Sequence, residues 1–163
     1  MSAAAKPQGR HVARSAARLA AVQALYQMEI TGRDVAEVAA EFVVHRLETP
    51  TDDLDLGNAD KPFFRDLLSG VVDRQVEIDN LIARALAKDW TLERLDSILR
   101  ALLRAGTYEI AFRTDIPPRV TIDEYVEVAL AFFETEEPKF VNGILDAIAH
   151  ETRPADMGAK PPR

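Results

Sequence analysis

The sequence of 163 residues contains no cysteine. Disulfides, iron–sulfur clusters, cysteine-ligated zinc and thiol catalysis are therefore excluded. No apolar run approaches the roughly 20 residues that a membrane-spanning helix needs, and the first residues lack the apolar region of a signal peptide. We therefore expect a cytoplasmic protein without a membrane partner. Because 47% of the residues are hydrophobic, the chain can still form a substantial core.

Patterns typical of metal, nucleotide and catalytic sites are missing as well. The three histidines lie far apart, and neither a His-Glu-x-x-His motif nor a phosphate loop of the Gly-x-x-x-x-Gly-Lys type is present. Glu134, Glu136 and Glu137 stand together, but clustered carboxylates are usually solvated surface. We expect no catalytic residue, no metal and no cofactor, and interpret the chain as a binding protein.

The spacing of the apolar residues predicts helices throughout, because no segment alternates with period two for long enough to form a sheet. The predicted helices cover residues 12–30, 34–47, 61–85, 95–113, 121–133 and 138–150. Gly32 fits the position after the end of the first helix. Asp34, Asp60 and Thr91 fit N-caps, and Thr121 with Glu124 fits a capping box. We predict an all-α fold, a compact bundle of six or seven helices over residues 10–150. Residues 1–9 and 151–163, rich in Ala, Pro, Gly and Lys, are predicted to be disordered tails.

Helical wheels assign core faces to the first predicted helix and to the last two. On the first helix the apolar side comprises Val12, Leu19, Val22, Tyr26 and Ile30. On the helix over 121–133 it comprises Ile122, Val126, Ala129 and Phe133, and on the last helix Val141, Ile144, Leu145 and Ile148. Gly143 falls inside that last helix, where glycine costs about 1 kcal/mol relative to alanine. We expect it to mark the close approach of another backbone or of a ligand.

Acidic residues are absent from the start of the chain. Residues 1–28 hold four basic and no acidic residues, whereas residues 29–163 hold 16 basic and 27 acidic residues, a formal charge of −11. Arg10, Arg14 and Arg18 recur every fourth position, and each step turns a helix by only about 40°, so they form one stripe. Such a stripe on an acidic protein fits a phosphate backbone. A solvated helix face is the alternative, and the charge pattern leaves it open.

Two aromatic residues flank the short connection between the last two predicted helices. Phe132 lies about 70° from the core face of its helix, and Phe140 lies about 90° from that of the next. Their rings either stack on unpaired bases, as in proteins that bind single strands, or only pack across the connection. The pattern alone does not decide between these two interpretations.

Four motifs, in this order and spacing, resemble those of the NusB family of bacterial transcription antitermination proteins. They are AVQALY (21–26), FRDLLSGV (64–71), RxxxYE with DIP (104–109 and 115–117) and KFVNGILD (139–146). The resemblance extends from about Arg10 to His150. It implies two helical subdomains packed together, without enzymatic activity.

The resemblance also implies partners and site residues. NusB proteins pair with NusE, which is also a small-subunit ribosomal protein, and the pair binds the boxA element of nascent, single-stranded RNA in the transcription elongation complex. The implied RNA-binding residues are Arg14 and Arg18, with Arg10 as an extension, and Phe132, Glu136 and Phe140. The implied NusE contacts are Tyr26 and Asp96. The acid at Glu136 would repel phosphate, which tempers affinity or favours selectivity. Asp96 either meets a basic partner or interacts with the dipole of the helix that it precedes.

Two alternatives stay open. A NusB-like domain also occurs at the front of some ribosomal-RNA cytosine methyltransferases. Because the sequence has no cysteine nucleophile and only about 13 residues after its last predicted helix, we expect at most a stand-alone relative of that RNA-binding domain. The other alternative is a helical protein–protein adaptor that does not bind RNA directly. Binding of a short RNA, with and without the partner, separates these functions.

Overall fold

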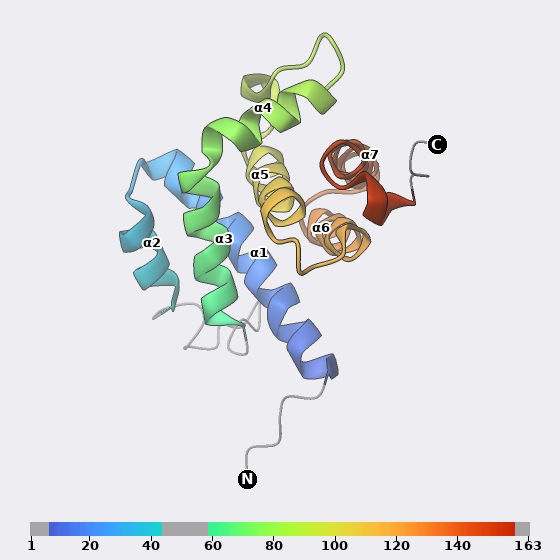
Figure 1. Cartoon of the computed structure of the whole chain (residues 1–163). Helices are drawn as coiled ribbons and strands as arrows, with labels where there is room; N and C mark the ends of the chain where they lie inside the picture. The colour runs from blue at the N-terminus through green and yellow to red at the C-terminus, as the bar shows by residue number, and fades with distance from the viewer. Residues whose placement is uncertain (1–6, 44–58, 159–163) are drawn as a thin grey trace. The chain divides into compact units, whose positions relative to one another are not determined.

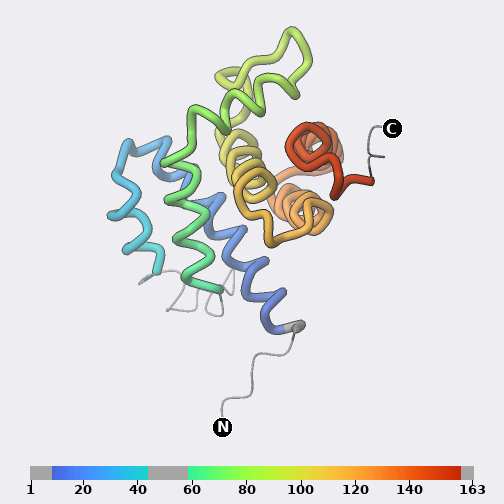
Figure 2. The backbone as a smooth tube through the Cα atoms, in the orientation of Figure 1, coloured from blue at the N-terminus to red at the C-terminus, as the bar shows by residue number. Residues whose placement is uncertain are grey.

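The computed structural model describes residues 7–43 and 59–158, and within these ranges every regular element is a helix (Figures 1 and 2). Seven α-helices are described, which confirms the predicted all-α class. The chain divides into two compact units, Met1–Ser69 and Gly70–Arg163. Among the described helices, none has the length and apolar character needed to cross a membrane.

The first unit is built from α1 (Pro7–Thr31), α2 (Val35–Phe42) and most of α3 (Lys61–Asp73). The turn from α1 to α2 follows from two residues that the sequence already indicated. Gly32 ends α1 with a φ of +70°, and Asp34 caps α2 by accepting a hydrogen bond from Ala36 N at 3.1 Å. The rings of Phe42 and Phe64 stack 5.9 Å apart and join α2 to α3. The predicted continuation of the second helix to residue 47 lies outside the described residues.

Asp60 begins α3, as predicted. Its carboxylate accepts a hydrogen bond from Phe63 N at 3.0 Å, and its own N–H donates to the carbonyl of Ala13 at 3.0 Å, which ties the start of α3 to α1. The single helix predicted over residues 61–85 is instead divided at Arg74, where φ is −114° and ψ is 19°. The apolar spacing continues through this break, so periodicity alone could not reveal it.

The core face predicted for α1 is partly wrong. Val12 and Ile30 are 57% and 60% exposed, although the wheel assigned both to the core. The fully buried positions of α1 include four alanines, Ala17, Ala20, Ala21 and Ala24. Small residues let neighbouring backbones approach closely, and a wheel weighted toward large side chains overlooks them.

The second unit contains α4 (Gln75–Ala85), α5 (Ser97–Phe112), α6 (Pro118–Phe132), α7 (Glu136–Thr152) and the 3₁₀ turns η2 (Leu92–Arg94) and η3 (Pro154–Met157). Helices α5, α6 and α7 each pack against the other two, and α4 packs against α5 and α7. Gly106 of α5 allows this packing, because a Cβ there would lie 3.0 Å from the side chain of Leu145. Arg104 links α5 to α4 by donating two hydrogen bonds to the carboxylate of Asp79, at 2.9 and 3.0 Å.

Helix α6 begins earlier than the predicted capping box. Pro118 occupies the first turn, where its missing N–H and restricted φ suit a helix start. Thr121 and Glu124 therefore lie within the helix and are buried. The Thr121 hydroxyl donates to the carboxylate of buried Glu109 at 3.1 Å. A threonine followed by an acid three residues later has the sequence pattern of a capping box. This threonine instead lies inside the helix and donates a buried hydrogen bond.

Helical structure extends into both segments that were predicted to be tails. Helix α1 already begins at Pro7, and α7 continues to Thr152 before η3 follows. Met157 is buried, and the guanidinium of Arg153 donates to the carbonyl of Ile116 at 2.7 Å. Residues 151–158 therefore belong to the folded unit, which corrects the tail predicted from residue 151.

Candidate nucleic-acid interface

The three arginines of the predicted stripe differ in exposure along α1. Arg10 is exposed, Arg14 is half-buried, and Arg18 is only 1% exposed. The reason is geometric: residues eight positions apart differ by about 80° around a helix. The stripe therefore turns from the surface toward the interior. Arg18, one of the arginines that the resemblance implies for RNA binding, is therefore buried.

The two inner arginines contact the same aromatic ring. The guanidinium carbons of Arg14 and Arg18 lie 5.0 and 5.1 Å from the centroid of the Phe63 ring, within cation–π range. Within the described residues, Arg14 Nε is buried without a hydrogen-bond acceptor. Arg14 is thus held in a defined position while part of its side chain reaches the surface. Arg10 and Arg14 are the members of the stripe that could meet a phosphate.

Tyr26, predicted to contact a partner protein, is half-buried on α1. The helical wheel placed Tyr26 on the core face. Its side chain is in part covered by the core and in part accessible to a partner. It belongs to the first unit with the arginines, whereas Asp96 belongs to the second.

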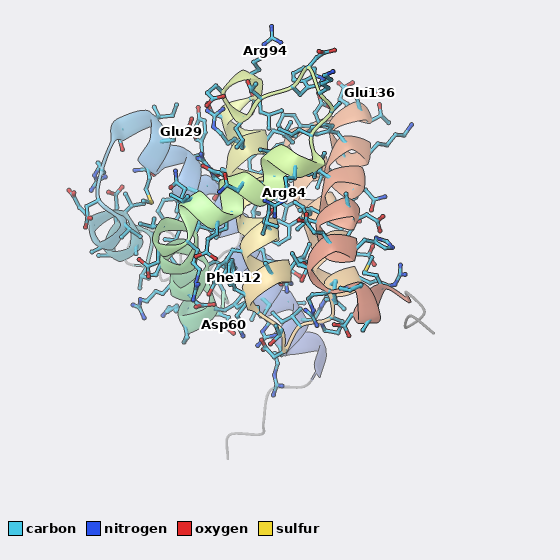
Figure 3. All side chains as sticks on the ribbon, turned by 45° about the horizontal axis from the view of Figure 1, so that its top comes forward. Glu29, Asp60, Arg84, Arg94, Phe112 and Glu136 are labelled. Carbon is cyan, nitrogen blue, oxygen red and sulfur yellow. The ribbon has the colours of Figure 1, made fainter. Side chains whose placement is uncertain are left out.

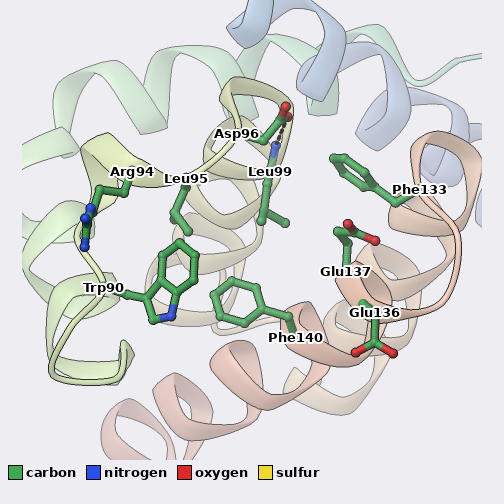
Figure 4. Close-up of a pocket in the computed structure, with 9 residues that line it drawn as sticks. All are labelled: Trp90, Arg94, Leu95, Asp96, Leu99, Phe133, Glu136, Glu137 and Phe140. Atoms are coloured by element: carbon green, nitrogen blue, oxygen red, sulfur yellow. Dashed lines mark hydrogen bonds between the residues drawn. The ribbon is translucent and has the colours of Figure 1, made fainter.

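A pocket of about 440 Å³ opens in the second unit (Figure 4). It is lined by three aromatic residues, three acids, two leucines and one arginine: Trp90, Phe133, Phe140, Asp96, Glu136, Glu137, Leu95, Leu99 and Arg94. The pocket brings together Glu136 and Phe140, predicted to bind RNA, and Asp96, predicted to bind protein. Its size is within the range of pockets that bind small organic groups.

A second hollow of about 390 Å³ lies at the connection between α6 and α7 and contains Phe132. Phe133, Glu136 and Glu137 line both hollows. Phe133 was predicted to be a core residue, and this is wrong. It is the C-cap of α6 with extended backbone angles (φ −133°, ψ 168°), so the wheel of the helix no longer applies to it, and its side chain is half-buried. Phe132, Phe133 and Phe140 are therefore all edge aromatics.

Asp96 caps α5. One oxygen of its carboxylate accepts hydrogen bonds from Ile98 N at 2.8 Å and Leu99 N at 3.3 Å, the second of which is drawn in Figure 4. Thr91, predicted to be a cap, makes no side-chain capping bond. The interaction of Asp96 with the helix start is thus real, and its exposed position also leaves it accessible to a partner.

The environment of Gly143 differs from the prediction. The residue is exposed on α7, and a Cβ built there would meet no atom within 4 Å. Within the described residues, no backbone approaches it closely. Side chains, not backbone, pack closely on two other glycines: the Tyr108 ring on Gly70, and the Leu145 side chain on Gly106.

Three residues of the pocket were not predicted as site residues from the sequence: Trp90, Arg94 and Glu137. Trp90 is 51% exposed in the polar segment between α4 and η2. An aromatic residue between polar neighbours, outside any apolar period, was a signal that could have revealed it. Arg94 donates to the carbonyl of Asp89 at 3.0 Å, and it lies at the same end of the second unit as Glu136 (Figure 3).

These features define an all-helical protein with a pocket lined by aromatic and acidic side chains, and comparisons with known proteins specify its family. The model of the NusB family matches residues 15–150. The Transcription antitermination protein NusB of Sinorhizobium fredii is 56% identical over 140 residues, which cover 86% of this chain and 88% of that protein. The protein of the same name from Caulobacter vibrioides is 53% identical, over 86% of this chain and 94% of its own length.

Solved structures agree with these sequence matches. The structure of T. maritima NusB has a TM-score of 0.72 and 34% identity, covering 95% of this chain and 99% of that one. A crystal structure of antitermination factors NusB and NusE in complex with dsRNA has a TM-score of 0.71 and 26% identity, covering 90% and 99%. The chain belongs to the NusB family of transcription antitermination proteins. This family is non-enzymatic.

Proposed function

We propose that this protein, paired with NusE, binds the boxA element of nascent RNA and so supports antitermination by the transcription elongation complex in the cytoplasm. The observation that carries the proposal is the pocket of the second unit, where Trp90, Phe133 and Phe140 expose aromatic surface. Each unpaired base that stacks on such a ring gains about 1–3 kcal/mol. The related NusB crystallised with NusE and dsRNA supports a function in RNA binding together with NusE, and the preference for unpaired bases rests on the pocket of this chain.

Phosphate binding is assigned to the first unit, where Arg10 is exposed and Arg14 is half-buried. Base contacts are assigned to Phe140 and Phe132, with Glu136 at the edge of both hollows. Glu136 repels phosphate, so RNA held here would present its bases rather than its backbone. The acidic balance of residues 29–163 suits a basic partner, because complementary potentials speed encounter and fix register.

The direct test is a titration of fluorescently labelled boxA RNA with this protein, alone and with NusE, at several salt concentrations. We expect tighter binding with NusE. If Arg10 and Arg14 each neutralise one phosphate, they should contribute roughly −1.4 to the slope of log affinity against log salt, from about −0.7 per phosphate on a single strand. The same RNA annealed to its complement should bind more weakly, because its bases are no longer available for stacking.

Other results would favour other functions. Equal affinity with and without NusE would discard the cooperative complex and favour a stand-alone RNA-binding relative of the methyltransferase domain. The absence of RNA binding in both conditions would favour a protein–protein adaptor.

For the partner contact, we expect Asp96→Asn to weaken NusE binding without a loss of stability. Asparagine caps a helix about as well as aspartate, so this variant removes only the charge. Asp96→Lys should also lose the cap, at a cost of about 1 kcal/mol in the free energy of unfolding. Calorimetry with NusE and urea unfolding measure the two effects.

The matched control is Glu93→Gln, because Glu93 is an exposed acid of η2 that does not line the pocket. This variant should bind NusE like the wild type. Undiminished NusE binding by Asp96→Asn would limit Asp96 to its capping role.

A further inference from the structure

The only tryptophan of the chain, Trp90, lines the same pocket as Phe140. The two side chains point toward one another across the pocket in Figure 4, and within the described residues neither ring stacks on another aromatic ring. Trp90 is 51% exposed on a segment between helices, although burying an indole ring is favourable. An exposed tryptophan beside a half-buried phenylalanine offers a stacking site for a flat ring.

We propose that Trp90 and Phe140 bind one unpaired nucleobase of the RNA, and that the Glu137 carboxylate in this pocket selects bases that carry an amino group. The inference rests on the proposed function and deepens it, because it adds a stacking residue and a basis for base selectivity. It concerns one pocket of the second unit and is independent of the arginines of the first.

The electrostatics of the pocket favour a neutral ring. Its carboxylates belong to Asp96, Glu136 and Glu137, and its one cation belongs to Arg94. Asp96 caps α5, and the two glutamates lie in the first turn of α7. Each helix N-terminus carries about half a positive elementary charge. Together with Arg94 these charges offset much of the negative charge of the three acids.

This balance bears on which group enters the pocket. A basic protein side chain would gain less from the carboxylates than their number indicates, because the helix starts already stabilise them. A phosphate would meet three acids and a single arginine. A nucleobase is neutral, stacks on aromatic faces and offers N–H groups to carboxylate oxygens. It therefore fits both the aromatic surface and the acceptors of the pocket.

The selectivity follows from the chemistry of the carboxylate. An ionised glutamate only accepts hydrogen bonds. The exocyclic amino groups of cytosine, adenine and guanine donate, as in the pairing of glutamate with cytosine N4. Uracil carries a carbonyl oxygen where cytosine carries its amino group, and two acceptors facing each other repel. Of the two glutamates that line the pocket, Glu137 is half-buried and Glu136 is exposed, so Glu137 is the carboxylate that is more shielded from solvent.

The experiment uses the intrinsic fluorescence of Trp90, which reports on this pocket without a label. The full chain with NusE is titrated with boxA RNA, and binding is followed in parallel by the anisotropy of a dye on the RNA. We expect Trp90 fluorescence to be quenched with the same midpoint as the anisotropy change. Trp90→Leu should weaken RNA binding by about 5- to 100-fold, whereas Trp90→Phe, which keeps a stacking ring, should lose less than about threefold.

Selectivity is tested by replacing each amino-bearing base of the RNA with uracil in turn. At one position we expect a loss of about tenfold in wild-type affinity, and this loss should disappear in Glu137→Gln, whose amide can donate to uracil. Glu93→Gln is the matched control, because Glu93 is an exposed acid that lines neither hollow. A uniform gain for all RNAs in Glu137→Gln would show only that repulsion of phosphate had been removed, and would overturn the selectivity.

Two further outcomes would overturn the inference. RNA binding detected by anisotropy without a change in Trp90 fluorescence would place the RNA elsewhere and leave the proposed function intact. Quenching of Trp90 by NusE alone, not altered by RNA, would assign the pocket to the protein partner. If no RNA binds under either readout, the proposed function fails together with the inference.

Discussion

Replacing Arg18 with alanine is expected to destabilise the protein by about 2–5 kcal/mol. This is the range for truncating a large buried side chain and leaving a cavity. Arg18 is 1% exposed, and its guanidinium lies over the Phe63 ring, so the substitution also removes a cation–π contact. For a protein of this size, the loss corresponds to a decrease of the melting temperature of roughly 2–4 °C per kcal/mol. Urea unfolding measures the effect directly.

Arg10 gives the matched control, because it lies two helical turns earlier on α1 and is exposed. Arg10→Ala should leave stability within about 0.5 kcal/mol of the wild type. It should weaken RNA binding and decrease the magnitude of the salt slope by about 0.7. A stable Arg18→Ala variant that loses RNA affinity would show instead that Arg18 reaches phosphate in solution.

Replacing Gly70 with alanine is expected to destabilise the protein by about 1–3 kcal/mol through overpacking. A Cβ at this position would overlap the ring of Tyr108. That ring is buried and stacks on Phe112 at 5.8 Å, and Arg74 in turn lies 4.6 Å from the centroid of the Phe112 ring. The tyrosine therefore has little room to move. Thermal or urea unfolding tests the change.

Gly143→Ala should instead increase the free energy of unfolding. Its Cβ meets nothing within 4 Å, and alanine in the interior of an exposed helix is favoured over glycine by about 1 kcal/mol. Combining Gly70→Ala with Tyr108→Leu should restore part of the stability lost by the first substitution, because the smaller side chain vacates the volume of the ring. If Gly70→Ala is as stable as the wild type, Tyr108 is more mobile than its packing indicates.

Local signals predicted the parts of the fold that depend on neighbouring residues. Gly32 and Asp34 were sufficient to define the turn between α1 and α2, and Asp60 to define the start of α3. Such signals succeed because a cap or a left-handed glycine acts within three or four residues. The same logic failed at Thr121, whose hydroxyl bonds to a glutamate on another helix.

Part of the candidate site could also be predicted, because local helical geometry gives the direction of a side chain relative to the core face of its own helix. The positions of Phe132 and Phe140 at the edges of their helices followed from helical geometry, and both are half-buried. Phe133 was misplaced because α6 ends before it. Trp90 was missed because it belongs to no helix, and only the fold places its ring beside Phe140.

The amino-acid sequence by itself determined the helical class, the family resemblance and most helix ends, because apolar period and capping are encoded in adjacent residues. Only the tertiary structure decided which members of the arginine stripe reach solvent and which side chains share a pocket. Burial depends on what packs against a helix, and Arg18 is covered where α3 brings Phe63 against α1. The pocket brings together residues about 50 positions apart in the sequence, such as Trp90 and Phe140. A pattern of neighbouring residues cannot predict such a proximity.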